Sequence, residues 1–469
     1  MKTIKESKKK LAILWGRPQP TQATYRPMKY LLKVEVEEGL LLYNIVTSEM
    51  VLLDDFEANM FKSLPIRYNE EMNELIARHF LVKDDFDEAK SVRQLRALVK
   101  KLEPSKRVEG FTILPTTECN ARCYYCFESD HKRCTMTERI ASDVVKYIIE
   151  KGKSKPVEIA WFGGEPLVGK KRISQICEEL RQNDITFKSS MVSNAYLFNE
   201  ELVTEAKNKW NLTNVQITLD GTEEVYNTTK AYINPKDNPY KRVLRNIQIL
   251  LDNGISVSVR LNVTEKNVND LKNLIEELAV KYKNKRGLAC YSHAVYEGVG
   301  FEPLVYNDKI REYVDEQVTE IDRILREKGL LGSLSVLPYL RVINCMSDND
   351  SCRLIYPDGT IGKCENKPSS EGIGDIYDDI TDENMANLYK QAEYFVTCEN
   401  CNLYPFCVNL KLCPETGMCS TYKLDWKRDR YTSIMKETYE NYKCNNITID
   451  ADTDTKNECE SLNKEVLCL

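Results

Sequence analysis

The sequence predicts an α/β protein: a parallel sheet with helices between its strands, a small strand-and-helix module before it, and a cysteine-rich region after it. Three observations support this fold class. Strand-like and helix-like segments alternate six times between residue 109 and about 300. The first hundred residues mix short strands with short helices, and residues 345–419 contain eight cysteines with little periodicity. Repeated β-α units build parallel sheets, here either doubly wound or closed into a partial barrel.

Composition and charge indicate the cellular compartment and the classes of partner to expect. Apolar runs stay well below the roughly 18 residues that a membrane span needs, and the basic N-terminus is too interrupted for a signal peptide. A net charge of −6 gives no reason to expect nucleic-acid binding. We therefore expect a cytoplasmic protein without membrane or nucleic-acid partners. Disulfides are rare in a reducing cytosol, so the 17 cysteines favour metal or iron–sulfur ligation over a disulfide scaffold.

The N-terminal module is expected to span residues 1–105. Residues 1–27 are basic and proline-containing, which indicates a loose arm. Alternating apolar and polar residues over 28–53 predict two or three antiparallel strands. Short helices are expected at 55–63 and 69–80, followed by a charged linking helix over 86–108. This order suggests a small winged-helix-like module.

The central β-α region is expected to span residues 106–320. Its predicted strands share short apolar or alternating runs, at 111–115, 156–162, 185–193, 215–220, 256–263 and 288–296. Its predicted helices share the helical period, at 138–151, 171–182, 200–210, 241–253 and 268–282, with a charged helix at 308–328 after them. Residues 335–444 form the cysteine-rich region, whose fold must depend on what its cysteines bind. Residues 445–469, with Cys459 and Cys468, are expected to form a polar tail.

Three closely spaced cysteines follow the first predicted strand of the central region. Cys119, Cys123 and Cys126 are spaced C-x3-C-x2-C. In β-α folds, ligands bind at the carboxyl ends of the strands, where this loop is expected. Three thiolates can hold a [4Fe–4S] cluster by three of its irons and leave the fourth open to a non-protein ligand. Open positions are typical of catalytic metals; a structural zinc site completed by His131 or another cysteine is the alternative.

The triplet, with Tyr125 before its last cysteine, resembles the signature of the radical S-adenosylmethionine (SAM) family. "FGGEP" after the second strand, "VSNA" at the end of the third and "LDG" at the end of the fourth match in the expected order. The resemblance implies a partial (β/α)6 TIM-like barrel. The residues implied to contact SAM are Tyr125, Gly163, Gly164, Glu165, Pro166, Ser193, Asn194, Asp220 and Arg260.

The sequence departs from the family pattern at one place. Relatives often carry "HD…R" after the DG, whereas this chain has "VYNTTK", with Asn227 and Lys230. No role is therefore carried over to these two positions. The other cysteines of the region, Cys134, Cys177 and Cys290, are expected to be plain thiols, because free cysteine often behaves as a small buried hydrophobe.

The later cysteines resemble the SPASM extension of this family, which implies two auxiliary [4Fe–4S] clusters and three clusters in total. One would be held by Cys345, Cys352, Cys364 and Cys413. The other would be held by Cys398, Cys401, Cys407 and Cys419. Cys413 follows Cys407 after five residues where the pattern has three, and Cys444 is an alternative last ligand. Two zinc sites would stabilise the region equally well.

The N-terminal module resembles the precursor-peptide recognition element of peptide-modifying relatives, which bind a leader peptide along a sheet edge. A purely structural domain and a DNA-binding winged helix are the alternatives. The implied function is a maturase that abstracts hydrogen from a ribosomally made peptide and installs a crosslink, foremost a cysteine thioether. Carbon–carbon and carbon–oxygen crosslinks remain open, the catalytic base is unassigned, and a flavodoxin or ferredoxin type of protein would supply electrons. The alternatives are a sulfatase-maturing enzyme that forms formylglycine and a non-enzymatic metal-binding scaffold.

Overall fold

The computed structural model describes residues 1–7, 14–102, 107–129, 131–282, 285–295, 308–331, 337–413, 419 and 421–445. The predicted polar tail lies outside these residues apart from Asn445. The chain divides into two compact units. The first combines Met1–Pro104, Ser335–Asn344 and Ala392–Cys468, and the second combines Ser105–Leu334 with Cys345–Gln391. The segment expected to form one C-terminal region, 335–444, is thus divided between the units.

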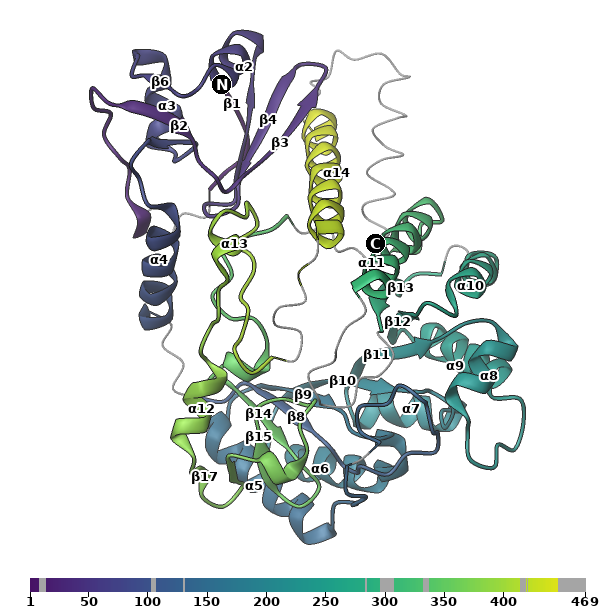
Figure 1. The fold of residues 1–469 in the computed structure, drawn as a ribbon. Helices are drawn as coiled ribbons and strands as arrows, with labels where there is room; N and C mark the ends of the chain where they lie inside the picture. Colours follow the sequence, from purple (N-terminus) through teal and green to yellow (C-terminus); the bar gives the residue numbers. More distant parts are fainter. Residues whose placement is uncertain are drawn as a thin grey trace. The chain divides into compact units, whose positions relative to one another are not determined.

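The second unit is built on the six predicted parallel strands, which lie side by side in chain order (Figure 1). A doubly wound sheet reverses its strand order near the middle, whereas this one does not, so the sequential order selects the partial barrel. Most of the strands alternate buried and less buried residues, because the helices cover one face of the sheet. Their bounds are β8 (Gly110–Ile113), β9 (Val157–Trp161), β10 (Phe187–Ser193), β11 (Leu212–Leu219), β12 (Ser256–Val263) and β13 (Leu288–Ala294).

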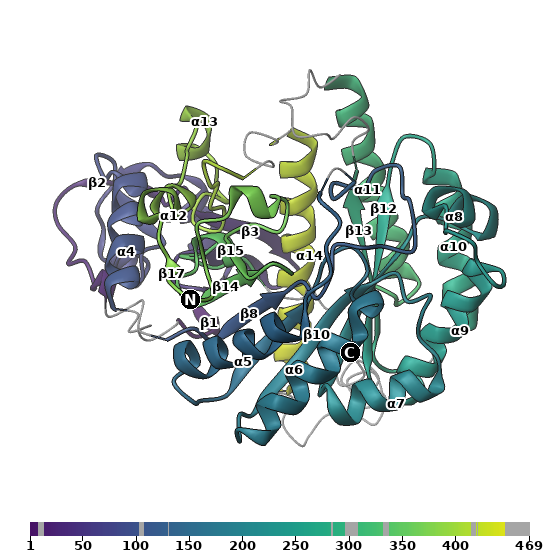
Figure 2. The ribbon, with the colours of Figure 1, turned by 90° about the horizontal axis from the view of Figure 1, so that it is seen from below.

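Helices between the strands run along the outside of this sheet (Figure 2). Each predicted helix is present with its apolar stripe buried. Their bounds are α5 (Glu138–Gly152), α6 (Lys170–Gln182), α7 (Glu200–Lys209), α9 (Pro239–Asp252), α10 (Val268–Lys281) and α11 (Asp308–Glu327). Asparagine side chains cap the starts of α7 and α9. One helix, α8 (Glu223–Lys230), was not predicted, because it is short and rich in residues of low helix propensity.

The first part of the cysteine-rich region extends this sheet. β14 (Cys352–Ile355) pairs in parallel with β8, and the antiparallel strands β15 (Thr360–Gly362), β16 (Gly374–Asp375) and β17 (Asp379–Ile380) follow outward. Leu354 and Tyr356 pack with Leu114 in a small apolar cluster. This segment therefore has a small apolar core in addition to its cysteines, because β8 supplies a partner. The short helices are η2 (Pro166–Gly169), η3 (Met346–Asp348), η4 (Ser369–Glu371) and α12 (Glu383–Tyr389).

The first unit contains two antiparallel sheets. One has the order β1-β5-β4-β3, formed by β1 (Lys2–Lys5), β5 (Glu49–Leu53), β4 (Gly39–Asn44) and β3 (Leu31–Val36). The other has the order β6-β2-β7, formed by β6 (Ile66–Arg67), β2 (Thr24–Pro27) and β7 (Leu81–Lys83). The expectation of a loose arm over 1–27 was wrong, because β1 and β2 lie within it. Both strands gain backbone hydrogen bonds from partners distant in the sequence, which local composition does not reveal.

Helices complete the first unit. Their bounds are α2 (Asp55–Lys62), η1 (Glu70–Met72), α3 (Asn73–Ala77), α4 (Glu88–Leu102), α13 (Val396–Glu399) and α14 (Thr421–Asn445). A capping box between Asp54 and Glu57 starts α2. Helix α14 lies beside β3 (Figure 1) and packs on Leu32. No helix in the described part of the chain has both the length and the apolar character needed to cross a membrane.

Candidate active site

The cysteine loop leaves the carboxyl end of β8. Cys126 N–H donates to the carbonyl of Cys123 at 3.2 Å, and Ala121 N–H donates to Cys119 Sγ at 3.4 Å. All three thiols are half-buried and free of disulfides. Burial, followed by the charge of Glu165, raises the pKa of Cys119 to about 12. Such a thiol ionises readily only when a metal's positive charge replaces its proton.

The "GGEP" loop packs against the backbone of the cysteine loop. A Cβ at Gly163, whose φ is +111°, would lie 2.3 Å from the carbonyl oxygen of Thr116. A Cβ at Gly164 would lie 2.6 Å from the carbonyl oxygen of Glu118, which also accepts the Glu165 N–H at 2.9 Å. Both glycines are therefore required for the two loops to approach this closely.

Glu165 joins this loop to the end of the next strand. Its carboxylate is 1% exposed and accepts hydrogen bonds from Ser193 Oγ at 2.9 Å, Asn194 N at 2.8 Å and Leu167 N at 3.1 Å. Burial raises the pKa of Glu165 to about 7, although these donors and Lys230 oppose the shift. The structure thus brings together Glu165, Ser193 and Asn194, and it buries Pro166 in the first turn of η2.

Asp220 is the centre of a second network at the same edge of the sheet. Its Oδ1 accepts from Tyr125 Oη at 2.8 Å and from Asn262 Nδ2 at 3.1 Å, and its Oδ2 lies 3.0 Å from Lys230 Nζ. Arg260 Nε donates to Asn262 Oδ1 at 3.1 Å. The ends of β9, β10, β11 and β12 therefore meet, together with α8, around the cysteine loop. Every residue predicted to contact SAM lies in the cysteine loop, in the "GGEP" loop or in one of the two hydrogen-bond networks.

The donor set at this edge fits a cluster with an exchangeable ligand. Among the described residues, no group of three or more His, Cys, Asp or Glu side chains is gathered tightly enough for a single metal ion. A cluster instead gives each thiolate its own iron, so its ligands stand further apart. Asn120 Nδ2, next to Cys119, is buried and has no hydrogen-bond partner among the described residues. An unpaired buried donor costs free energy, which a carboxylate or ribose oxygen of a bound molecule would offset.

The auxiliary cysteines fall into two groups, one in each compact unit. Cys345 caps η3, Cys352 opens β14 and Cys364 follows β15, all in the second unit. Cys345 is close enough to contribute to the raised pKa of both Cys352 and Cys364, in each of which burial is the main cause. Cys413, the fourth ligand expected with these three, belongs to the first unit.

The other group lies on a tightly turned segment of the first unit. Cys401 N–H donates to the carbonyl of Cys398 at 2.9 Å. Cys407 and Cys419 both act on the raised pKa of Cys401, after burial. Arg96 of α4 donates five hydrogen bonds to this part of the unit; the acceptors are the carbonyls of Arg341, Tyr404, Pro405 and Cys407 and the hydroxyl of Tyr394. The arginine therefore fixes the backbone from which Cys407 projects.

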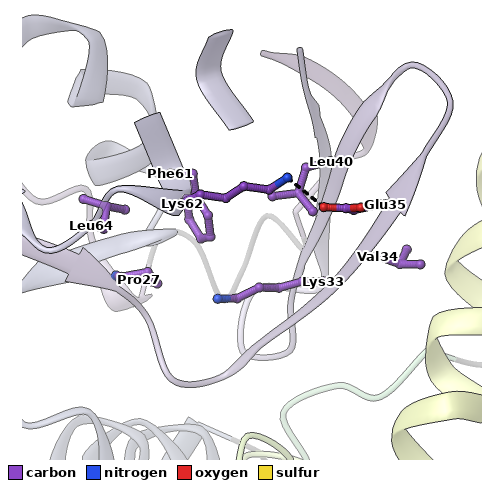
Figure 3. Close-up of a pocket in the computed structure, with 8 residues that line it drawn as sticks. All are labelled: Pro27, Lys33, Val34, Glu35, Leu40, Phe61, Lys62 and Leu64. Atoms are coloured by element: carbon purple, nitrogen blue, oxygen red, sulfur yellow. Dashed lines mark hydrogen bonds and ion pairs between the residues drawn. The ribbon is translucent and has the colours of Figure 1, made fainter. Parts of the chain in front are cut away.

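A pocket of about 380 Å³ opens beside β3 in the first unit (Figure 3). Its apolar lining comes from Leu40, Phe61, Leu64 and Pro27, and Lys33 projects into it with its ammonium 5.0 Å from the Phe61 ring centroid. Lys62 and Glu35 pair at 2.7 Å along its side (Figure 3). Among the described strands, β3 forms one edge of its sheet and β1 forms the other.

Sequence reasoning assigned no role to four residues of these sites, although three of them have a recognisable feature in the sequence. Arg96 stands among Val92, Leu95 and Val99 on the apolar face of α4, where a charge is unusual. Asn262 lies two residues after Arg260 and therefore on the same face of β12. Asn120 lies inside the cysteine motif itself. Lys230 was set aside because it departs from the family pattern, and only the fold places it beside Asp220.

Comparisons with known proteins find matches over the part of the chain that contains this site. Residues 113–278 match the Radical SAM superfamily. The radical SAM cyclopropyl synthase TigE of Paramaledivibacter caminithermalis is 22% identical over 232 residues, 46% of this chain and 48% of that protein. A GTP 3',8-cyclase of Clostridium perfringens (strain SM101 / Type A) is 23% identical over 303 residues, 62% of this chain and 90% of that protein. The chain thus spans about half the length of the first of these relatives.

Among solved structures, native anSMEcpe with bound AdoMet and Kp18Cys peptide has a TM-score of 0.55 and 14% identity. The match covers 71% of this chain and 99% of that one, and it supports the barrel fold. Residues 113–278 are therefore identified as a domain of the Radical SAM superfamily. A domain of this superfamily implies one [4Fe–4S] cluster and SAM as cofactors.

Proposed function

We propose that the protein is a radical SAM maturase that crosslinks a ribosomally made peptide, with a cysteine thioether as the foremost product. The observation that carries the proposal is the meeting of the cysteine loop with buried Glu165 at the carboxyl edge of the barrel strands. Cys119, Cys123 and Cys126 would hold the cluster. Glu165, Ser193, Asn194, Asp220 and Arg260 border the space for SAM.

When bound, the cluster and SAM would supply a carbon-centred radical able to take hydrogen from an unactivated carbon of the peptide. The chain's own residues provide the setting for this chemistry. Gly163 and Gly164 bring the backbone close to the cysteine loop, and Glu165 fixes the two strand ends. Tyr125, held by Asp220 and Lys230, keeps one orientation in the loop. Preorganised groups of this kind bind without further reorganisation cost.

The N-terminal unit is the proposed site of peptide recognition. An extended leader peptide would add to the edge of β3 through backbone hydrogen bonds. The pocket beside this strand would then take an apolar side chain against Phe61 and Leu64, with Lys33 facing an acidic neighbour. The antiparallel sheet with helices α2 and α3 supports a winged-helix-like module. The relative anSMEcpe was solved with a bound peptide, which favours a peptide over a nucleotide substrate.

The auxiliary cysteines suit a net oxidation. Joining a C–H carbon to a cysteine sulfur removes two hydrogens, and each iron–sulfur centre carries one electron at a time. Two auxiliary clusters in a SPASM-type region would accept the electron left on the crosslinked peptide. A cytosolic flavodoxin or ferredoxin type of protein would reduce the first cluster. Carbon–carbon crosslinking and formylglycine formation are the competing reactions.

The test starts from protein reconstituted with iron and sulfide without oxygen, supplied with SAM and dithionite. We expect 5′-deoxyadenosine by chromatography and about twelve irons per chain. A cysteine-containing peptide encoded beside the gene should then lose two hydrogens while keeping its sulfur, and tandem mass spectrometry should place a C–S link. Loss of sulfur would indicate formylglycine, and a zinc-bound protein that makes no 5′-deoxyadenosine would refute the enzyme proposal.

A further inference from the structure

Lys230 places a buried positive charge beside the cysteine loop. It ends α8, and its side chain is 5% exposed while that of Asp220 is 1% exposed. Its Nζ lies 3.0 Å from Asp220 Oδ2 and donates to Tyr125 Oη at 2.8 Å. The ammonium also lies 5.5 Å from the centroid of the Tyr125 ring. An ammonium so far from solvent persists only when it is paired and hydrogen-bonded, and this one has both kinds of partner.

The backbone around Lys230 is bonded directly to the same loop. Arg122 N–H donates to the carbonyl of Lys230, and Ile233 N–H donates to the carbonyl of Asn120, each at 2.9 Å. The two loop residues in these hydrogen bonds, Asn120 and Arg122, lie between Cys119 and Cys123. The distance from the lysine to the cysteine loop is therefore set by two backbone hydrogen bonds as well as by the Tyr125 contact.

A fixed cation at this place acts on any redox centre that the loop holds. Three thiolates already bring negative charge to the site, and a one-electron reduction of a cluster adds one more. Charges interact strongly where water is excluded, so a nearby ammonium stabilises the reduced state more than the oxidised one. Asp220 carries the opposite charge and therefore lowers the reduction potential. The net effect on the potential depends on which side chain, Lys230 or Asp220, lies nearer to the cluster.

We propose that Lys230 is a positioning residue that raises the reduction potential of the cluster held by Cys119, Cys123 and Cys126, with Asp220 as the opposing charge. The inference rests on the cluster site of the proposed function. It assigns a role to Lys230, one of the two positions at which this chain departs from the family pattern, and it gives a reason for a positive charge at this position.

The test is a potentiometric titration of the reconstituted protein, without oxygen, followed by electron paramagnetic resonance. The signal that changes on addition of SAM identifies the cluster of this loop among the others. Lys230→Met should shift its midpoint potential to more negative values at unchanged iron content, and Lys230→Arg should restore the wild-type potential. Tyr226→Phe is the matched control, because it removes the buried hydroxyl bond to Tyr232 beside Lys230 and alters no charge; it should leave the potential unchanged.

The opposite shift in a second variant separates charge from loop damage. Asp220→Asn removes the opposing negative charge, so the potential should become more positive, whereas a loosened loop would move both variants in the same direction. If Lys230→Met loses iron, Asp220→Asn alone tests the inference. A shift of its potential to more positive values then supports the inference, and any other result overturns it. An unchanged potential in both variants, or shifts of the same sign, would overturn the inference. Absence of a SAM-responsive cluster in the wild-type protein would instead overturn the proposed function.

Discussion

Glu165 accepts a hydrogen bond from the hydroxyl of Ser193 at 2.9 Å, which ties the loop after β9 to the end of β10. The same carboxylate accepts the backbone N–H of Asn194 at 2.8 Å. Two sequence motifs that lie 28 residues apart thus share one buried acid. The arrangement requires an acceptor at both oxygens of the Glu165 side chain.

Glu165→Gln should weaken SAM binding and lower 5′-deoxyadenosine formation by about tenfold or more. A glutamine side chain has one accepting oxygen where glutamate has two, because its NH2 group is a donor. It therefore cannot accept all the hydrogen bonds that Glu165 accepts, and one buried donor loses its partner at a cost of about 1–3 kcal/mol. Equilibrium dialysis with labelled SAM and chromatography of the product measure the two effects. Glu158→Gln is the control, because Glu158 lies exposed on β9. Equal losses in both variants would contradict the role of Glu165.

Cys126→Ala should remove about four irons per chain and abolish SAM cleavage, because two thiolates do not hold the cluster. Iron analysis and the 5′-deoxyadenosine assay measure both losses. Cys134→Ala is the matched control, since Cys134 lies near the same loop and its thiol makes a long contact of 4.0 Å with the carbonyl of Thr135. If Cys126→Ala kept its full iron content and turnover, the three cysteines would not be the ligands of the cluster.

Arg96→Met should loosen the cysteine segment of the first unit while sparing SAM cleavage. Five hydrogen bonds are lost at once, four of them to backbone carbonyls, and the expected loss of stability is about 3 kcal/mol. We expect lower iron content and incomplete peptide crosslinking. Arg93→Met is the control one turn away, because Arg93 pairs with Glu399 at the exposed surface, where ion pairs contribute little. Similar iron loss in both variants would contradict the anchoring role.

Asp379→Asn should destabilise the sheet extension by about 2 kcal/mol at neutral pH. Asp379 pairs with Arg353 of β14 at 3.1 Å and accepts from Tyr147 of α5 at 2.5 Å. Burial opposes its charge, but Arg353, Tyr147 and Lys151 hold the pKa of Asp379 below its ordinary value of 3.8. Its stabilisation is therefore complete above that value and is lost as the pH falls through and below it.

Urea unfolding of the reconstituted protein checks both the size and the pH dependence of this effect. The difference between wild type and Asp379→Asn should be largest near neutrality and shrink below about pH 4. Asparagine tolerates the φ of +62° at this position, so backbone strain does not contribute. Asp378→Asn, a change at the exposed neighbour, should leave the unfolding midpoint unaltered. A difference that grows toward low pH would contradict a stabilising role of the ionised Asp379 carboxylate.

Lys33→Glu should weaken binding of the precursor peptide about tenfold and leave SAM cleavage without peptide unchanged. The ammonium projects into the pocket beside β3 (Figure 3), whereas that of Lys62 pairs with Glu35. Reversing the charge at Lys33 would repel an acidic leader. Fluorescence polarisation of the labelled peptide encoded beside the gene provides the measurement. Lys171→Glu, on the exposed surface of α6, is the control. Unchanged affinity would place the leader elsewhere.

Local patterns predicted the elements of the barrel well. All six strands and their main helices follow from apolar periodicity, since each element buries one face. Strands β1 and β2 were missed, because their partners β5 and β7 lie far along the chain and their own composition is polar. β14 was missed for the same reason: it becomes a strand by pairing with β8, more than 200 residues earlier.

By itself, the sequence determined the cysteine loop and the order of the motifs around it, because ligand spacing and strand ends are local properties. The tertiary structure alone decided that the strands keep chain order, and so form a partial barrel. It also decided which distant side chains meet: Lys230 with Asp220, and Arg96 with the cysteine segment. Buried charges are stable only beside partners of opposite charge or hydrogen-bonding groups, and those partners come from segments far apart in the chain.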